Sequence, residues 1–109
     1  MGAFNTIKGK AMCPSCGYPT ELEAQFKYGD TWQQSYRIGD KIRWGGNDIG
    51  TPGRKHVLVE AIGGPCSYCQ TDGLDFDVVI KNDEIVGIEP VRGGRVAAGP
   101  EGFVVVDAL

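Results

Sequence analysis

Two Cys-x-x-Cys pairs are the residues of this sequence whose types and spacing point most directly to chemistry. Cys13 and Cys16 lie in "MCPSCGY", and Cys66 and Cys69 lie in "PCSYCQ". The chain has 4 cysteines, so the two pairs leave no thiol over. Two residues between cysteines allow a tight turn that aims both sulfurs at one point, and thiolates suit a tetrahedral zinc ion. The pairs therefore predict one zinc ion held by four sulfurs.

Other uses of four cysteines stay open at this point, with zinc favoured among them. Iron also accepts four thiolates and would make the protein an electron carrier. Disulfides are rare in a reducing cytosol. A redox-active pair of the thioredoxin type opens a helix, whereas "CGYPTELEAQF" runs directly into an alternating strand pattern. A catalytic zinc keeps one open position, which four cysteines would close, so we expect a structural metal and no enzyme.

The first cysteine pair carries the stronger local signal. Pro14 fixes φ early in the turn, and Gly17 can adopt the left-handed conformation that turns backbone N–H groups toward sulfur. The second pair has no proline between its cysteines, and its nearest following glycine is Gly73. The sequence therefore predicts one regular cysteine turn and a second, less regular one.

The composition favours an all-β fold. The chain has 109 residues, which suits a single domain over 1–109 stabilised by zinc. Its 17 glycines and 6 prolines indicate many turns, and runs rich in Val and Ile are typical of strands. We therefore expect an antiparallel sheet or small barrel, inserted between the two cysteine pairs.

Alternation of apolar and polar residues predicts where the strands lie. "TELEAQFKY" alternates strictly, as a half-buried strand does. "HVLVEAI" is apolar on both faces, which suits a central strand. The expected elements are an N-terminal arm over 1–11, a hairpin over 20–44, a central strand over 56–62, a hairpin over 74–91, a flexible connection over 92–102 and a C-terminal strand over 103–107.

The hairpin over 74–91 can pair in two registers. A two-residue loop at Asn82-Asp83 would place Ile80 beside Ile85 on one face. A three-residue loop ending at Glu84 would instead match Phe76, Val78 and Ile80 with Val86, Ile88 and Pro90. We favour the three-residue loop because its buried face is more apolar.

The motifs "CPSCGY" and "CSYC", with β-hairpins beside them, resemble the zinc-ribbon superfamily and, more distantly, rubredoxin. The resemblance covers residues 11–28 and 60–90. It implies a tetrathiolate site at Cys13, Cys16, Cys66 and Cys69. Members of this superfamily are commonly parts of nucleic-acid machinery or protein-interaction modules, so the resemblance by itself selects no function.

A group of basic residues flanks the loop over 45–55 and, with one aromatic residue that could be core or surface, could form a binding surface. These residues are Lys41, Arg43, Arg54, Lys55 and Trp32. A basic patch with an aromatic neighbour suits RNA or single-stranded DNA. The alternative is a solvated strand face, which the formal net charge of −3 favours.

These observations favour a non-enzymatic protein-interaction or adaptor module built around zinc. A strand at the C-terminus could add to a partner's sheet. Binding of nucleic acid through the basic residues is the alternative, and a rubredoxin-like iron carrier is the third. No apolar run is long enough for a membrane helix and the first residues lack a secretion signal, so we expect a cytoplasmic protein with no membrane partner and no small-molecule substrate.

Overall fold

The computed structural model describes residues 4–46, 48–63, 65–90 and 103–105 and is all-β, as the composition predicts. The strands are β1 (Asn5–Met12), β2 (Pro19–Phe26), β3 (Gly29–Asp30), β4 (Ser35–Arg37), β5 (Asp48–Ile49), β6 (Val57–Gly63), β7 (Leu74–Lys81), β8 (Glu84–Pro90) and β9 (Phe103–Val105).

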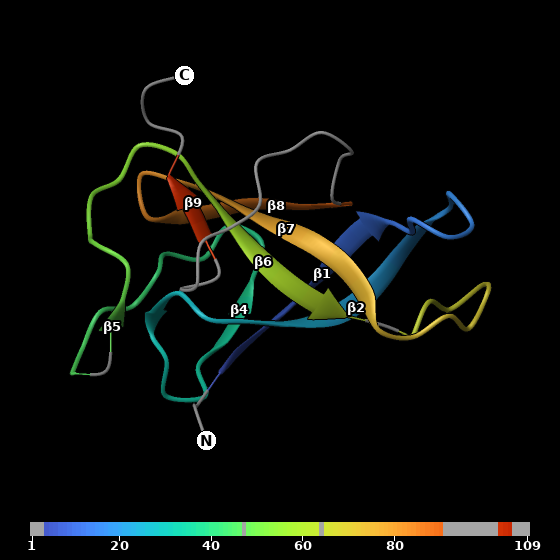
Figure 1. Cartoon of the computed structure of the whole chain (residues 1–109), viewed down its shortest axis with the longest axis horizontal. Helices are drawn as coiled ribbons and strands as arrows, with labels where there is room; N and C mark the ends of the chain where they lie inside the picture. Colours follow the sequence, from blue (N-terminus) through green and yellow to red (C-terminus); the bar gives the residue numbers. More distant parts are fainter. Residues whose placement is uncertain (1–3, 47, 64, 91–102, 106–109) are drawn as a thin grey trace.

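The larger sheet curls into a half-barrel (Figure 1). Its strands follow the order β4-β1-β2-β6-β7-β8, and β9 pairs with β6 beside the main path. The short strands β3 and β5 form a second sheet of their own. The segment over 45–55, expected to lack regular structure, therefore contributes β5 to that small sheet.

The half-barrel is drawn together on the side opposite the cysteine loops by the segment over 39–42. The Gly39 amide donates to the carbonyl of Ile85 at 2.7 Å, and the Ile42 amide donates to the carbonyl of Asp83 at 2.7 Å. These bonds connect the chain just after β4 to the start of β8. The two ends of the strand order thus meet, which encloses the apolar side chains between them.

The expectation of an N-terminal arm is wrong for residues 5–11, because they form β1 in the body of the sheet. β1 pairs with β2 along its whole length and with β4 on its other side. Ile7 is fully buried, and so is Asn5, whose side-chain amide donates to the carbonyl of Tyr28 at 3.0 Å. The inward residues of β1 include Gly9 and small or polar side chains, so the hydrophobic pattern of the strand is too weak to read from the sequence.

The hairpin expected over 20–44 is also wrong. β2 is a strand with the predicted alternation, but its partners are β1 and β6. β4 instead pairs in parallel with β1. Alternation shows which residues of a strand face the core, but it does not show which strand lies beside it.

The hairpin over 74–91 is confirmed, and it combines both predicted registers. Lys81 pairs with Glu84 across a two-residue turn, and Asn82 and Asp83 both have positive φ, at 52° and 64°. A bulge follows, and beyond it Val78 pairs with Ile88. The predicted three-residue loop is therefore wrong, whereas the predicted pairing farther from the turn is right, because Val86 is the extra residue in the bulge.

The central strand is confirmed as β6, which pairs with β2, β7 and β9. The C-terminal strand is described over 103–105 only, where it completes the sheet against the first half of β6. The predicted connection over 92–102 and the end of the C-terminal strand lie outside the described residues.

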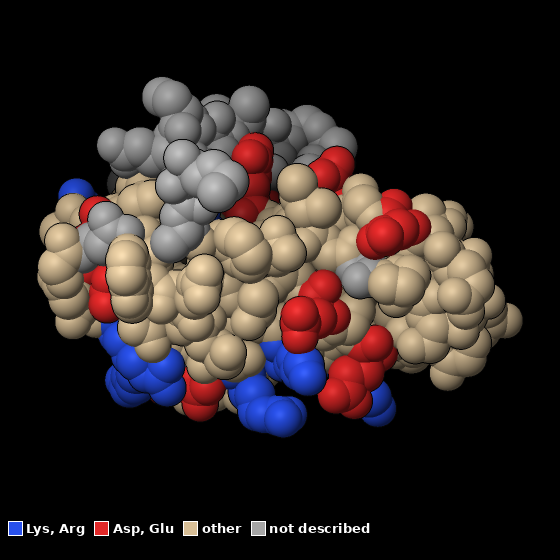
Figure 2. All heavy atoms as spheres, turned by 90° about the horizontal axis from the view of Figure 1, so that it is seen from below, with Lys and Arg blue, Asp and Glu red and all other residues tan. Residues whose placement is uncertain are grey.

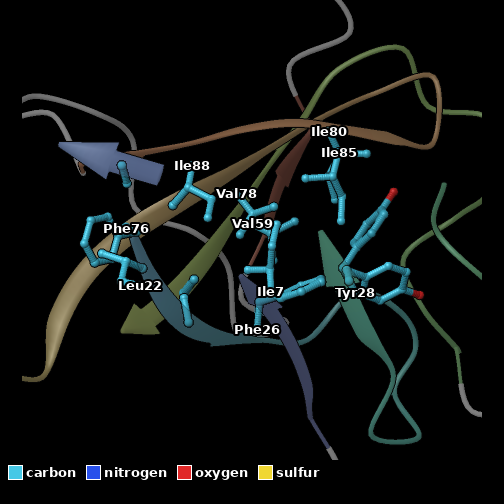
Figure 3. Packing of buried hydrophobic residues seen from close by; sticks show 14 of the residues in the cluster. Ile7, Leu22, Phe26, Tyr28, Val59, Phe76, Val78, Ile80, Ile85 and Ile88 are labelled. Atoms are coloured by element: carbon cyan, nitrogen blue, oxygen red, sulfur yellow. The ribbon is translucent and has the colours of Figure 1, made fainter. Parts of the chain in front are cut away.

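One apolar core fills the curve of the sheet (Figure 3). Side chains from β1, β2, β6, β7 and β8 point toward one another, and Tyr28 closes the group beyond β2. The fully buried apolar residues of this core include Ile7, Tyr28, Val57, Val59, Phe76, Val78, Ile80 and Ile85.

Replacement of Ile7 tests whether β1 belongs to the core. We expect Ile7→Ala to lower the free energy of unfolding by about 2–5 kcal/mol, because it removes apolar contacts and leaves a cavity. Lys10→Ala, on the exposed face of the same strand, is the matched control and should change it by less than about 0.5 kcal/mol. Urea unfolding of the zinc-loaded proteins measures both values, and equal stability of the two variants would contradict the assignment.

Candidate metal centre

The four cysteine sulfurs converge on one point. The Sγ atoms of Cys13, Cys16, Cys66 and Cys69 all lie within 4.8 Å of one another. Cys13 Sγ lies 3.7 Å from Cys69 Sγ, and Cys16 Sγ lies 3.7 Å from Cys66 Sγ. Each short distance joins one sulfur from the first pair to one from the second, so the cluster connects the two loops.

These separations fit a tetrahedral metal. With zinc–sulfur bonds of about 2.3 Å, the sulfurs of a regular tetrahedron lie about 3.8 Å apart. Disulfide sulfurs are bonded at about 2.05 Å, whereas all four cysteines here are free thiols. The geometry therefore fits a metal ion held by four cysteines.

Strand pairing explains how two cysteine pairs separated by 49 residues in the sequence meet in space. The first cysteine loop connects β1 to β2, and the second connects β6 to β7. β2 and β6 pair antiparallel through Ala24 and Gly63, so the chain that follows β6 runs back along β2, and Ser67 reaches Thr20 near the start of β2. Both loops consequently project from the same end of the molecule, as Figure 1 shows for the blue loop and the yellow loop.

The two loops have the same backbone hydrogen bonds. The Cys13 amide donates to the carbonyl of Tyr18 and the Cys66 amide to that of Thr71, each at 3.0 Å. In the same way, the amides of Gly17 and Gln70 donate to the carbonyls of the first cysteines of their pairs, at 2.8 and 3.0 Å. The second cysteine turn is therefore as regular as the first, which corrects the expectation from the sequence.

Gln70 occupies the position that Gly17 holds in the first loop. Its φ is 63°, against 77° for Gly17. A left-handed conformation costs a residue with a side chain about 1–2 kcal/mol. The side-chain amide of Gln70 donates to the carbonyl of Ser67 at 3.3 Å, which helps to hold the turn. The sequence signal for this turn is weak because the residue that adopts it is not a glycine.

Backbone amides and hydroxyl groups surround the sulfurs. The amides of Ser15 and Tyr68 point to the first cysteines of their own loops, at 3.4 Å from Cys13 Sγ and 3.4 Å from Cys66 Sγ. The Thr71 hydroxyl accepts from the Cys69 thiol at 3.3 Å, and it can donate to the same sulfur once that thiol has lost its proton. Such donors spread the negative charge of a tetrathiolate centre. Thr71 was not among the predicted residues, since a threonine two positions after a cysteine carries no distinctive pattern.

A pair of hydroxyl groups, one from each segment, links the loops to each other. The Thr20 hydroxyl, which is buried at the start of β2, donates to the Ser67 hydroxyl at 3.2 Å. It also accepts from the Ser67 amide at 3.3 Å. The second loop is therefore anchored to β2 independently of the sulfurs.

The surroundings of the thiols shift the pKa values of Cys69 and Cys16 in opposite directions. The Thr71 hydroxyl and amide lower the pKa of Cys69 to about 6. The Tyr18 amide lowers the pKa of Cys16, but burial and the neighbouring sulfurs outweigh it and raise this pKa to about 12. A metal that binds all four sulfurs as thiolates must displace the protons that remain, so its affinity rises with pH.

Three of the four predicted basic residues lie near one another, at the turn between β7 and β8. Lys41 Nζ lies 3.9 Å from Glu84 Oε1, and the Asn82 amide donates to the carbonyls of Arg54 and Lys55, each at 3.2 Å. Lys41, Arg54 and Lys55 therefore surround the turn between β7 and β8. That turn carries Asp83 and Glu84, so the positive charges lie among negative ones.

Arg43 and Trp32 lie apart from that turn. Arg43 stacks over the ring of Tyr36, with Cζ 5.2 Å from the ring centroid, and donates to Gln34 Oε1 at 2.9 Å. Trp32 is 71% exposed in the loop before β4. The side-chain oxygen of buried Asn5 holds this loop by accepting from the Gln34 amide at 3.0 Å.

Comparison of the chain with protein-family models, with curated proteins and with solved structures found no match in any of the three. The cysteine geometry is consistent with a zinc-ribbon-like turn, and the resemblance rests on that geometry and on the two motifs. In the part of the chain that the structure describes, no helix has the length and apolar character needed to cross a membrane.

Exchange of glycine and glutamine between the two loops tests their equivalence. We expect Gln70→Gly to raise the free energy of unfolding by about 0.5–1 kcal/mol, because glycine adopts positive φ without strain. Gly17→Gln should lower it by a similar amount. A Cβ at Gly17 meets no atom within 4 Å, so that loss would arise from the backbone alone. Urea unfolding in excess zinc measures the free energy of unfolding of both variants. Changes of the same sign in the two variants would contradict the equivalence of the two turns.

Removal of the Thr71 hydroxyl tests its role at the sulfurs. We expect Thr71→Val to weaken zinc binding about tenfold, the lower limit for lost hydrogen bonds around a metal site. The loss should be larger at pH 6 than at pH 8, because the pKa of Cys69 rises toward its ordinary value when the donor is gone. Thr71→Ser keeps a hydroxyl and should bind as the unchanged protein does. Competition with a chromophoric chelator measures the affinities, and equal affinities of the Thr71→Val variant and the unchanged protein at both pH values would contradict the role.

Proposed function

We propose that this protein is a non-enzymatic protein-interaction module in which Cys13, Cys16, Cys66 and Cys69 hold one structural zinc ion. The sulfur geometry supports a closed four-ligand site. Zinc supplies folding free energy to such a site, because the site is not formed in the unfolded chain. A reducing compartment such as the cytoplasm keeps the thiols available for the metal.

The observation that carries the proposal is the character of the surface that the two cysteine loops form. We call it the tip, and it comprises residues 12–20 and 65–71. These segments contain no Lys, Arg, Asp or Glu, although 23% of the whole chain is charged. Figure 2 shows this end of the molecule, at the right, as a surface of uncharged residues beside a charged body. Depletion of charge is typical of the centre of a protein interface.

Two exposed tyrosines mark the tip. Tyr18 is 62% exposed and Tyr68 is 65% exposed, and their ring centroids lie 5.5 Å apart. Each ring belongs to a different cysteine loop, so the metal that joins the loops also holds the two rings together. Tyrosines often anchor protein interfaces, because they offer a large contact area at a small cost in conformational entropy.

Nucleic-acid binding has weaker support. The basic residues at the turn between β7 and β8 are interspersed with acidic ones, and Figure 2 shows Lys and Arg along one side of the molecule with Asp and Glu between them. The tip carries no cation to contact phosphates. Nucleic-acid affinity depends on the release of counterions by several such contacts.

Iron in place of zinc would make the centre an electron carrier instead. Iron and zinc accept the same four thiolates, so the geometry fits both. Elemental analysis and the visible spectrum of the purified protein separate the two. The proposal requires zinc and a colourless protein.

Photo-crosslinking from the tip tests the function. A photo-reactive phenylalanine derivative in place of Tyr68 should capture one protein in cells, identified by mass spectrometry. Capture should weaken when Cys13→Ser removes a metal ligand, because only the hydrogen bonds between Thr20 and Ser67 then hold the two loops together and the tyrosine pair is less firmly positioned. The same derivative in place of Trp32, an exposed aromatic residue outside the tip, is the matched control and should capture at most background proteins.

Three results would count against this function. Capture from position 32 but not from position 68 would move the interface away from the tip. Capture of RNA in place of protein, with binding that weakens steeply as salt rises, would favour the nucleic-acid alternative. Undiminished capture after Cys13→Ser, with zinc lost, would separate the metal from recognition.

A further inference from the structure

A small hollow lies beside the second cysteine loop. Its volume is about 190 Å³, and Glu23, Gln25, Ile62, Gly63 and Asp72 line it. Pockets that enclose drug-sized ligands or cofactors measure about 300–1,000 Å³. The hollow is therefore of a size for one long side chain rather than for a small-molecule substrate.

The end of the ladder between β2 and β6 creates this hollow. Gln25 is the register partner of Ile62, and Ala24 is that of Gly63, where β6 ends. Among the described residues, β6 pairs with β2 only as far as Gly63 and Ala24, whereas β2 itself begins at Pro19. Glu23 therefore lies next to the last described pair. Asp72, which directly follows the tip, supplies the opposite wall.

The lining combines negative charge with an apolar wall. Glu23 and Asp72 supply carboxylates, and Gln25 supplies an amide oxygen. Ile62 is 60% exposed, which is unusual for an isoleucine in a central strand. Lysine and arginine place their methylene stems on apolar surface while their charged ends reach polar partners, and a guanidinium binds carboxylates strongly.

We propose that this hollow receives a basic side chain, Lys or Arg, of the protein that binds the tip. The inference rests on the proposed function and adds the chemistry of the partner, which is a segment with a cation beside apolar or aromatic residues. The tip and the hollow are continuous along the chain, because the tip ends at Thr71 and Asp72 follows it.

The surrounding charge favours this occupant. Asp75 is the register partner of Ile62, and Glu21, which lies on the same exposed face of β2 as Glu23, has Lys10 as its own register partner. The formal net charge of the chain is −3, and four thiolates with one Zn²⁺ would make it −5. An anionic group would be repelled, whereas a cation is attracted.

An existing ion pair does not block the hollow. Lys8 Nζ lies 3.8 Å from Glu23 Oε2, and both side chains are more than half exposed. Exposed pairs of this kind contribute about 0–1 kcal/mol. A partner's cation that also contacts Asp72 and covers Ile62 can therefore replace Lys8.

Titration of the full, zinc-loaded protein with N-acetyl-arginine amide tests the hollow directly. Chemical shifts of the backbone amides of Glu23, Gln25, Ile62 and Asp72 should change in a saturable way. N-acetyl-citrulline amide, which has nearly the same shape without the charge, should leave them unchanged. Asp72→Asn and Glu23→Gln should each weaken binding of the arginine probe about two- to fivefold, the range for one exposed charge pair.

Glu89→Gln is the matched control, because it removes one exposed carboxylate from β8 outside the hollow and should leave the affinity unchanged. Equal effects of arginine and citrulline probes, or equal affinities for all variants, would overturn the proposal. Crosslinking from position 68 without arginine binding would overturn the proposal for the hollow and leave the proposed function standing. Arginine binding without crosslinking would remove the proposed function and leave a hollow specific for basic groups.

Discussion

The structure depends on three residue pairs between β2 and β6. This short antiparallel ladder joins one half of the sheet, with β4, β1 and β2, to the other half, with β6, β7 and β8. Because the strands are antiparallel, the ladder also fixes the loop after β1 and the loop after β6 at the same end. The convergence of four sulfurs, the pairing of two tyrosines and the hollow beside Asp72 all follow from this one arrangement.

The core and the cysteine cluster connect the two halves in addition to the ladder. Inside the curve, apolar side chains from both halves pack together with almost no exposure. At the tip, the sulfurs connect the same two halves across the first and second cysteine loops. A ladder of three pairs is short, so the packed core and the clustered cysteines, which could hold a metal ion, add further connections between the halves. The cysteines are therefore part of the architecture.

Local features of the sequence predicted the structure correctly wherever the interacting residues lie close together in the chain. The spacing of the four cysteines predicted the ligand set, because each turn needs only two intervening residues. The alternation in β2 and the apolar run in β6 predicted strands at the right places. The hairpin of β7 and β8 was predicted as well, but its loop length and its bulge between Val79 and Ile80 were missed, since a bulge lets a two-residue turn coexist with the other register.

The sequence by itself determined the cysteines that cluster, the all-β class and the strands with strong alternation. Only the tertiary structure decided the partners of those strands, and it placed β1 within the sheet although, apart from Ile7, its inward residues are small or polar. It also decided that Gln70 takes the conformation of Gly17 and that Thr71 reaches a sulfur. The physical reason is that these properties arise from long-range backbone pairing, which fixes each position regardless of how weak its local pattern is.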